Sequence, residues 1–286
     1  MADHVADHAG LGPLPPLFDT PQHWRPAALD TDTPHVARVY DYLLGGKDHF
    51  RTDRAAAELL LRANPYLRDA CREQRDFLRR AVRHLAAEGV SQFVDIGTGL
   101  PAAPTAHQIA RAVQPAARVA YVDNDPIVLS HARVLLTDGG PGTAFVEGDL
   151  REPEALLREP ALRAVIDLGE PVAMVVTGLL HFLPDHEQPA KHVRTLMDAC
   201  APGSCLVLTH GASDLAVELA RATSAAFRQA AIPCQARSRD EVLELVGELE
   251  LAEPGLVPMA AWRPERNLTK TVRERQIAYG VVARKG

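Results

Sequence analysis

Short apolar runs alternate with amphipathic segments from about residue 90 onward, which predicts strands alternating with helices. Such an alternation is typical of a mostly parallel sheet with helices on both faces. Two later apolar segments are joined by a stretch too short for a parallel crossover, so an antiparallel pair is expected there. The predicted strands cover residues 91–95, 118–123, 143–147, 172–177 and 204–209, with the antiparallel pair at about 256–261 and 277–283.

The chain before this alternation divides at about residue 30. Residues 1–30 are rich in proline, aspartate, histidine and glycine, a composition that predicts a mobile N-terminal arm. Residues 31–89 carry apolar side chains at helical spacing and predict an N-terminal helical cap. Residues 90–286 then form the α/β domain.

Composition narrows the class of protein. A net charge of -6 over 286 residues argues against a nucleic-acid partner, which requires a basic face. No apolar run reaches the length of a membrane span, and the N-terminus lacks a signal sequence, so no membrane partner and a cytoplasmic location are expected. The four cysteines lack metal-ligand or disulfide spacing, and no metal site is predicted.

Acidic residues stand at the ends of three predicted strands. Asp95 precedes two glycines at alternate positions, Gly97 and Gly99, which allow a tight turn and the close approach of a ligand. Asp123 ends the second strand, and Asp149 follows the third. Each acid alone is also typical of a turn. Because parallel strands bring their carboxyl ends to one sheet edge, the three together predict a site for a nucleoside.

Four segments resemble motifs of the actinobacterial S-adenosyl methyltransferase family, long a domain of unknown function. The segments are VYDYLLGGKD at 39–48, DIGTGLP at 95–101, YVDNDP at 121–126 and LHFLPD at 180–185. The resemblance implies S-adenosylmethionine (SAM) as cofactor and a Rossmann-like class I methyltransferase fold. We therefore expect a seven-stranded, mostly parallel sheet with an antiparallel last strand, helices on both faces and an N-terminal helical lid. The acceptor is not implied.

The chemistry of SAM gives the residues after the first strand candidate roles. Asp95 can balance the amine of the ligand, directly or through water. The backbone N–H groups of Gly97, Thr98 and Gly99, with the following helix N-terminus, suit its carboxylate.

The ends of the next two strands suit the nucleoside of SAM. Asp123 can accept hydrogen bonds from both ribose hydroxyls, and Asn124 is expected at the adenine edge. Asp149 can accept from the exocyclic amine, and the backbone N–H of Leu150 can donate to the ring.

The helical cap supplies further candidate contacts with the cofactor. Tyr42, Gly46 and Lys47 belong to the most distinctive motif, although a glycine pair is also a common helix stop. Arg75 can reach the SAM carboxylate or an acidic substrate, together with Arg72 on the same helix face. A solvated charged face is the alternative for both arginines.

His181 is the candidate catalytic residue. It follows the fourth predicted strand, where its imidazole can take a proton from an attacking hydroxyl or amine. A histidine packed against Phe182 and bonded to backbone is the competing interpretation.

The predicted function is SAM-dependent methylation of a small-molecule acceptor. A nicotinamide-dependent oxidoreductase shares the glycine turn and the downstream acid, but Pro101 and Ala102 follow here and the third glycine of that fingerprint is missing. A non-catalytic SAM-binding sensor or partner protein is a second alternative. The oligomeric state stays open, with a homodimer as one option.

Overall fold

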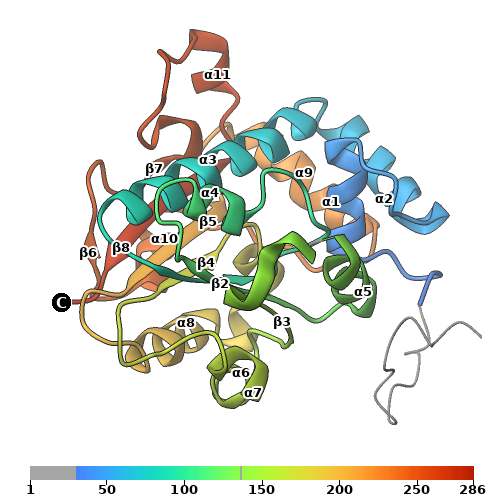
Figure 1. Cartoon of the computed structure of the whole chain (residues 1–286). Helices are drawn as coiled ribbons and strands as arrows, with labels where there is room; N and C mark the ends of the chain where they lie inside the picture. Colours follow the sequence, from blue (N-terminus) through green and yellow to red (C-terminus); the bar gives the residue numbers. More distant parts are fainter. Residues whose placement is uncertain (1–29, 136) are drawn as a thin grey trace, which may run out of the picture.

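Five parallel strands form the larger part of a central sheet (Figure 1). The computed structural model describes residues 30–135 and 137–286, so the predicted arm, residues 1–30, lies outside the described residues apart from Asp30. The parallel strands are β1 (Gln92–Ile96), β2 (Arg118–Asp123), β3 (Thr143–Glu147), β4 (Ala173–Val176) and β5 (Cys205–Gly211).

The other part of the sheet is antiparallel. β8 (Ala278–Arg284) runs antiparallel to β5, and its outer edge pairs with two short strands, β6 (Glu250–Leu251) and β7 (Val257–Pro258). The strand order is β3-β2-β1-β4-β5-β8-β6, with β7 also beside β8. This order confirms the predicted fold class.

The strand count differs from the expectation of seven, because the described residues form an eight-stranded sheet. The predicted strand at 256–261 is cut to two residues, since the chain turns into the 3-10 helix η4 (Met259–Ala261). The unpredicted β6 is too short to show an alternating pattern.

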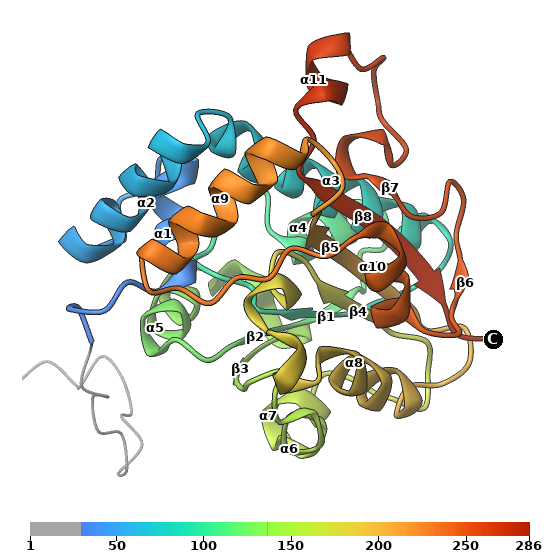
Figure 2. The same cartoon turned by 180° about the vertical axis from the view of Figure 1, so that it is seen from behind.

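Helices cover both faces of the sheet (Figures 1 and 2). Alternate strand residues point to opposite faces, so Phe93 and Val119 pack with α3 and α4, whereas Val94 and Ala120 pack with the helices of the other face. The first face has α3 (Leu67–Ala87), α4 (Ala106–Arg111) and α5 (Pro126–Leu135). The second has α6 (Pro153–Arg158), α7 (Pro160–Arg163), α8 (Pro189–Asp198) and α10 (Arg239–Val246).

A third apolar cluster joins α1 (Val36–Leu44), α2 (Arg51–Ala63) and the start of α3 to α9 (Val217–Gln229). The three helices α1, α2 and α9 lie side by side in both views (Figures 1 and 2). The helical cap expected from residues 31–89 is therefore packed against a helix that comes much later in the chain.

Short elements complete the described chain. They are the 3-10 helices η1 (Thr137–Gly142), η2 (Leu180–Phe182) and η3 (Asp185–Glu187), and the helix α11 (Lys270–Glu274). Among the described residues, none of the helices has the length and apolar character that a membrane span needs.

Gly280 of β8 lies against the ring of Phe77. A Cβ at residue 280 would stand 2.7 Å from a ring carbon of Phe77, a fully buried residue of α3. We expect Gly280→Ala to lower the free energy of unfolding by about 1–3 kcal/mol, because the buried ring has no space to move into. Denaturant titration measures the loss. Gly286→Ala, with no described atom within 4 Å, is the control, and equal stability of both variants would contradict this packing.

Candidate active site

A pocket of about 190 Å³ lies over the carboxyl ends of β1, β2, β4 and β5. The strand order reverses between β1 and β4, and open α/β sheets bind ligands at such a switch point. The walls of the pocket also come from α1, α3 and α9. The sheet edge and the helical cap therefore enclose the same space.

Most of the predicted site residues line this pocket. They are Arg75, Asp95, Gly97, Thr98, Gly99, Asp123, Asn124 and His181. The other predicted residues, Tyr42, Gly46, Lys47, Asp149 and Leu150, are not among the residues that line it.

The glycine turn after β1 is held against β2. The backbone N–H groups of Gly97 and Thr98 both donate to the carbonyl of Val122, at 2.8 and 3.1 Å. Gly97 and Gly99 have φ angles of 70° and 66°, a region that favours glycine. No described atom lies within 4 Å of a Cβ placed on Gly99, so the turn leaves room for a ligand to approach the backbone.

Asp123 is held by backbone donors on both carboxylate oxygens. The N–H of Gly99 donates to Oδ2 and the N–H of Asp125 to Oδ1, both at 2.9 Å. Burial raises the pKa of Asp123 above its ordinary value. Each oxygen keeps a further lone pair, so the oriented carboxylate can accept hydrogen bonds from ligand hydroxyls as well.

Asp95 is a buried carboxylate with one side-chain donor, the hydroxyl of Thr98 at 3.1 Å. Burial raises the pKa of Asp95 to about 6, although the charge of Arg75 acts in the opposite direction. The Arg75 guanidinium itself donates to the carbonyls of Ala102 and Pro104, at 2.5 and 2.9 Å. Arg75 therefore ties α3 to the loop that follows the glycine turn.

Asp149 lies one hydrogen bond away from the pocket. It accepts from the Asn124 amide at 2.8 Å and forms an ion pair with Arg151 at 2.6 Å. Burial works to raise the pKa of Asp149, but the bonds from Arg151 and Asn124 outweigh it and lower the pKa. Leu150 is part of the apolar core below the sheet edge.

The Gly45–Lys47 segment of the distinctive motif forms a closed turn. Gly45, with φ 87°, ends α1, and a Cβ on Gly46 would overlap the carboxylate of Asp41. Lys47 is exposed, and the Tyr42 hydroxyl bonds to Glu58. Gly45 and Gly46 therefore shape the turn, and Tyr42 joins α1 to α2.

The opposite face of the same motif reaches the pocket. Val36, Val39, Tyr40 and Leu43 line it from α1. Their helical spacing is visible in the sequence, but that spacing is typical of core packing and does not by itself indicate a ligand site. The Tyr40 hydroxyl donates to the carbonyl of Cys71 at 2.9 Å and joins α1 to α3.

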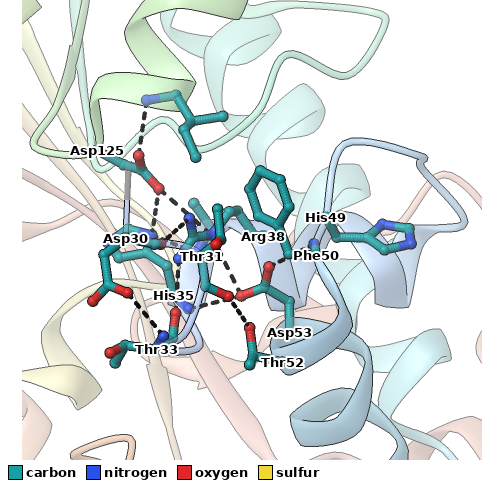
Figure 3. A network of polar contacts seen from close by, with 12 residues as sticks. Asp30, Thr31, Thr33, His35, Arg38, His49, Phe50, Thr52, Asp53 and Asp125 are labelled. Carbon is teal, nitrogen blue, oxygen red and sulfur yellow. Dashed lines mark hydrogen bonds and ion pairs between the residues drawn. The ribbon is translucent and has the colours of Figure 1, made fainter. Parts of the chain in front are cut away.

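A polar network connects the cap with the end of β2 (Figure 3). His35 Nδ1 lies 3.0 Å from Asp125 Oδ2, and Arg38 Nε lies 3.3 Å from Asp53 Oδ1. The buried Asp53 also accepts from the backbone N–H groups of His35 and Phe50, at 2.9 and 2.8 Å. Since Asp125 donates its own N–H to Asp123, the network runs from the cap to the pocket.

The sequence does not reveal that these residues contact one another. Asp125 precedes Pro126 and is recognisable as a helix cap, and its carboxylate does accept from the N–H of Ile127 at 2.8 Å. Burial works to raise the pKa of Asp125, but the bonds from His35 and Ile127 outweigh it and lower the pKa.

His181, on η2 after β4, lies against Phe182 and His210, with ring centroids 4.2 and 5.7 Å away. Burial lowers the pKa of His181 to about 3, so the imidazole is neutral. Among the described residues, no hydrogen-bond partner meets its buried Nδ1. The packing against Phe182 agrees with the competing interpretation, but a ring-to-backbone bond is not found within the described chain.

Arg237 holds the loop that carries His181. Its buried guanidinium donates to the carbonyls of Leu180 and Leu183, at 3.3 and 3.0 Å, and to Asp185 Oδ1 at 2.6 Å. It also donates to His210 Nε2 at 2.8 Å. A single arginine before a helix carries no pattern that reveals such a role, so sequence reasoning missed it.

Within residues 30–135 and 137–286, no group of three or more histidine, cysteine, aspartate or glutamate side chains is arranged to hold a metal ion.

The sheet order and the position of the pocket at the switch point are those of the class I methyltransferase architecture. The model of a family described as S-adenosyl methyltransferase matches residues 22–286. The chain belongs to this family, and it is a SAM-dependent methyltransferase.

Two solved structures are similar over nearly the whole chain. A DUF574 family protein from Streptomyces avermitilis shares 40% identity with a TM-score of 0.86, covering 90% of this chain and 99% of that one. A candidate methyltransferase from Thermobifida fusca shares 39% identity with a TM-score of 0.85, covering 92% and 99%. A comparison with curated proteins gave no match. The family membership sets the nicotinamide alternative aside.

The raised pKa of Asp95 makes stability depend on pH. Between about pH 4 and 6 the folded protein binds a proton that the unfolded chain has released, so stability falls as pH rises through this window. We expect Asp95→Asn to raise the free energy of unfolding of the ligand-free protein by about 1–3 kcal/mol near neutral pH, and to give no gain near pH 4.

Denaturant titrations near pH 7 and near pH 4 test this expectation. Asp69→Asn, at an exposed acid of α3, is the matched control and is expected to leave stability near neutral pH unchanged. If Asp95→Asn raised the free energy of unfolding equally at both pH values, ionisation of the buried carboxylate would not be the cause of the gain.

Proposed function

We propose that the pocket binds SAM over the ends of β1 and β2 and holds a small-molecule acceptor over the ends of β4 and β5, beneath the helical cap. The observation that carries the proposal is that one pocket contains the glycine turn, Asp95, Asp123, His181 and the inner faces of α1 and α9. Enclosure by helices favours a small acceptor over a protein or nucleic acid.

The residues around the glycine turn suit the amino-acid end of SAM. The open space at Gly99 permits close approach of the ligand to the backbone of the turn. The N–H groups of Gly97, Thr98 and Gly99 already donate to Val122 and Asp123, so the turn offers the ligand carboxylate space rather than these donors. The buried Asp95 suits the amine, because a cation beside it offsets the burial of its charge. Arg75, engaged with two carbonyls, serves to position this loop and is not assigned to an acidic substrate.

The end of β2 suits the nucleoside. Asp123, held by two backbone donors, would accept the ribose hydroxyls. Asn124 lines the pocket and is bonded to Asp149, so this pair would lie at the adenine edge. SAM supplies an electrophilic methyl group on a positively charged sulfur, and a closed pocket protects it from water.

Residues 31–89 act in this proposal as a lid over the cofactor domain of residues 90–286. The lid contacts would be His35, Val36, Val39, Tyr40 and Leu43, in place of the expected Tyr42, Gly46 and Lys47, which do not line the pocket. All four cysteines are free, which supports a cytoplasmic location.

The ribose assignment predicts a loss of affinity in Asp123→Ala. Two hydroxyls would lose their buried partner, so the affinity for SAM and for S-adenosylhomocysteine (SAH) should fall by about 1–3 kcal/mol. Isothermal titration calorimetry measures it. Asp198→Ala, at an exposed acid of α8, should bind as the wild type does. Wild-type affinity in Asp123→Ala would refute the assignment.

The lid assignment predicts that Asp53→Ala weakens SAM binding, although Asp53 does not line the pocket. Without this carboxylate, the buried Arg38 and the N–H groups of His35 and Phe50 lose their partner. We expect a roughly tenfold or greater loss of SAM affinity and faster hydrogen exchange in residues 34–50. Part of the free energy of SAM binding would then be used to order the lid.

Calorimetry and hydrogen exchange with mass spectrometry measure the two effects of Asp53→Ala. Asp69→Ala, which removes an exposed partner of Arg72, is the control. If SAM affinity and exchange are the same in Asp53→Ala as in the wild type, the helices only pack against the site and do not gate it.

A further inference from the structure

The charged residues that line the pocket lie at its cofactor end. Among the described lining residues, the formally charged ones are Arg75, Asp95 and Asp123, and neither lysine nor glutamate is present. All three contact the glycine turn or the loop after it. The part of the pocket over β4 and β5 therefore offers no counter-ion to an acceptor.

Apolar side chains predominate in the walls of that acceptor end, beside the hydroxyl groups of Thr223 and Ser224. Leu43 and Leu67 come from the cap, Phe182 from η2, Phe227 from α9, and Cys234 and Ile277 from later loops. The rings of Phe182 and Phe227 meet edge to face, with centroids 5.6 Å apart. Burial raises the pKa of Cys234 to about 12, so its thiol is neutral and adds to the apolar wall.

His181 provides a hydrogen-bonding group at this end. It lines the pocket, and its Nδ1 has no partner within the described chain. Its neighbour His210 is fully engaged, with Nδ1 bonded to the carbonyl of Gly211 and Nε2 to Arg237, each at 2.8 Å. The Arg237 network keeps the His181 loop in place, so the imidazole is fixed before a ligand arrives.

We propose that the acceptor is an uncharged, largely apolar ring compound whose hydroxyl group hydrogen-bonds to His181. The proposal rests on the proposed function, since it concerns the second half of the same pocket. A buried ion without a counter-ion is strongly disfavoured, which excludes carboxylates and protonated amines from this end. A hydroxyl is neutral, and a buried polar group such as His181 requires a partner of this kind.

A set of matched probes tests the charge requirement. 2-Naphthol, 2-naphthoate and 2-naphthylmethylammonium share one ring system and differ in the charge of one substituent. With SAH bound to prevent turnover, we expect 2-naphthol to bind at least about tenfold more tightly than either ion, as measured by calorimetry. Tighter binding of an ion, or no binding of any probe to the SAH complex, overturns the proposal. Failure of SAH itself to bind overturns the proposed function instead.

Two variants, with a third as control, test the roles of His181 and Phe227. His181→Ala should lower 2-naphthol affinity about tenfold, the effect of one buried hydrogen bond, and leave naphthalene affinity unchanged. Phe227→Ala should weaken both compounds, whereas Val217→Ala, at an exposed position of the same helix, should weaken neither. SAH affinity, unchanged in all three, shows that each variant folds. An equal loss of 2-naphthol and naphthalene binding in His181→Ala would show that the imidazole only packs.

Discussion

The structure depends on two carboxylates at the end of β2. Asp123 orients the glycine turn through the N–H of Gly99, and the N–H of Asp125 holds the same carboxylate from the other side. Asp125 in turn contacts His35 at the start of the cap. Each bond is short and involves an ionised group, so a shift of the cap is transmitted to the turn through few atoms. A short series of polar contacts therefore links the helical cap to the glycine turn.

Burial destabilises the ionised forms of two carboxylates at the pocket, Asp95 and Asp123. Burial raises the pKa of both Asp95 and Asp123, so the folded protein keeps carboxylates under conditions in which water would solvate them better. A protein that only had to fold would place apolar or amide groups there. Acids retained against this penalty are typical of functional sites, which supports the proposal that a ligand cation and ligand hydroxyls pair with them.

The sequence predicts what local pattern and chain order determine. Apolar runs locate the parallel strands, and the acids after the first two lie at the pocket because parallel strands end at one sheet edge. Contacts between distant segments leave no such pattern. Arg237 binds the loop of His181, and α9 completes the cap, but neither has a periodicity that differs from ordinary surface or core. The distinctive 39–48 motif was recognised, yet its glycines form the turn while its apolar face lines the pocket.

The pocket has an ionic end and an apolar end, and different elements of the fold supply them. Its ionic end is built from strand ends and tight turns, where backbone geometry places Asp95 beside the hydroxyl of Thr98 and Asp123 beside the N–H of Gly99. Its apolar end is built from side chains of α1, α9 and the loops around Cys234 and Ile277. Under the proposed function, the sheet edge sets the cofactor requirement, and the helices that cover it set the identity of the acceptor.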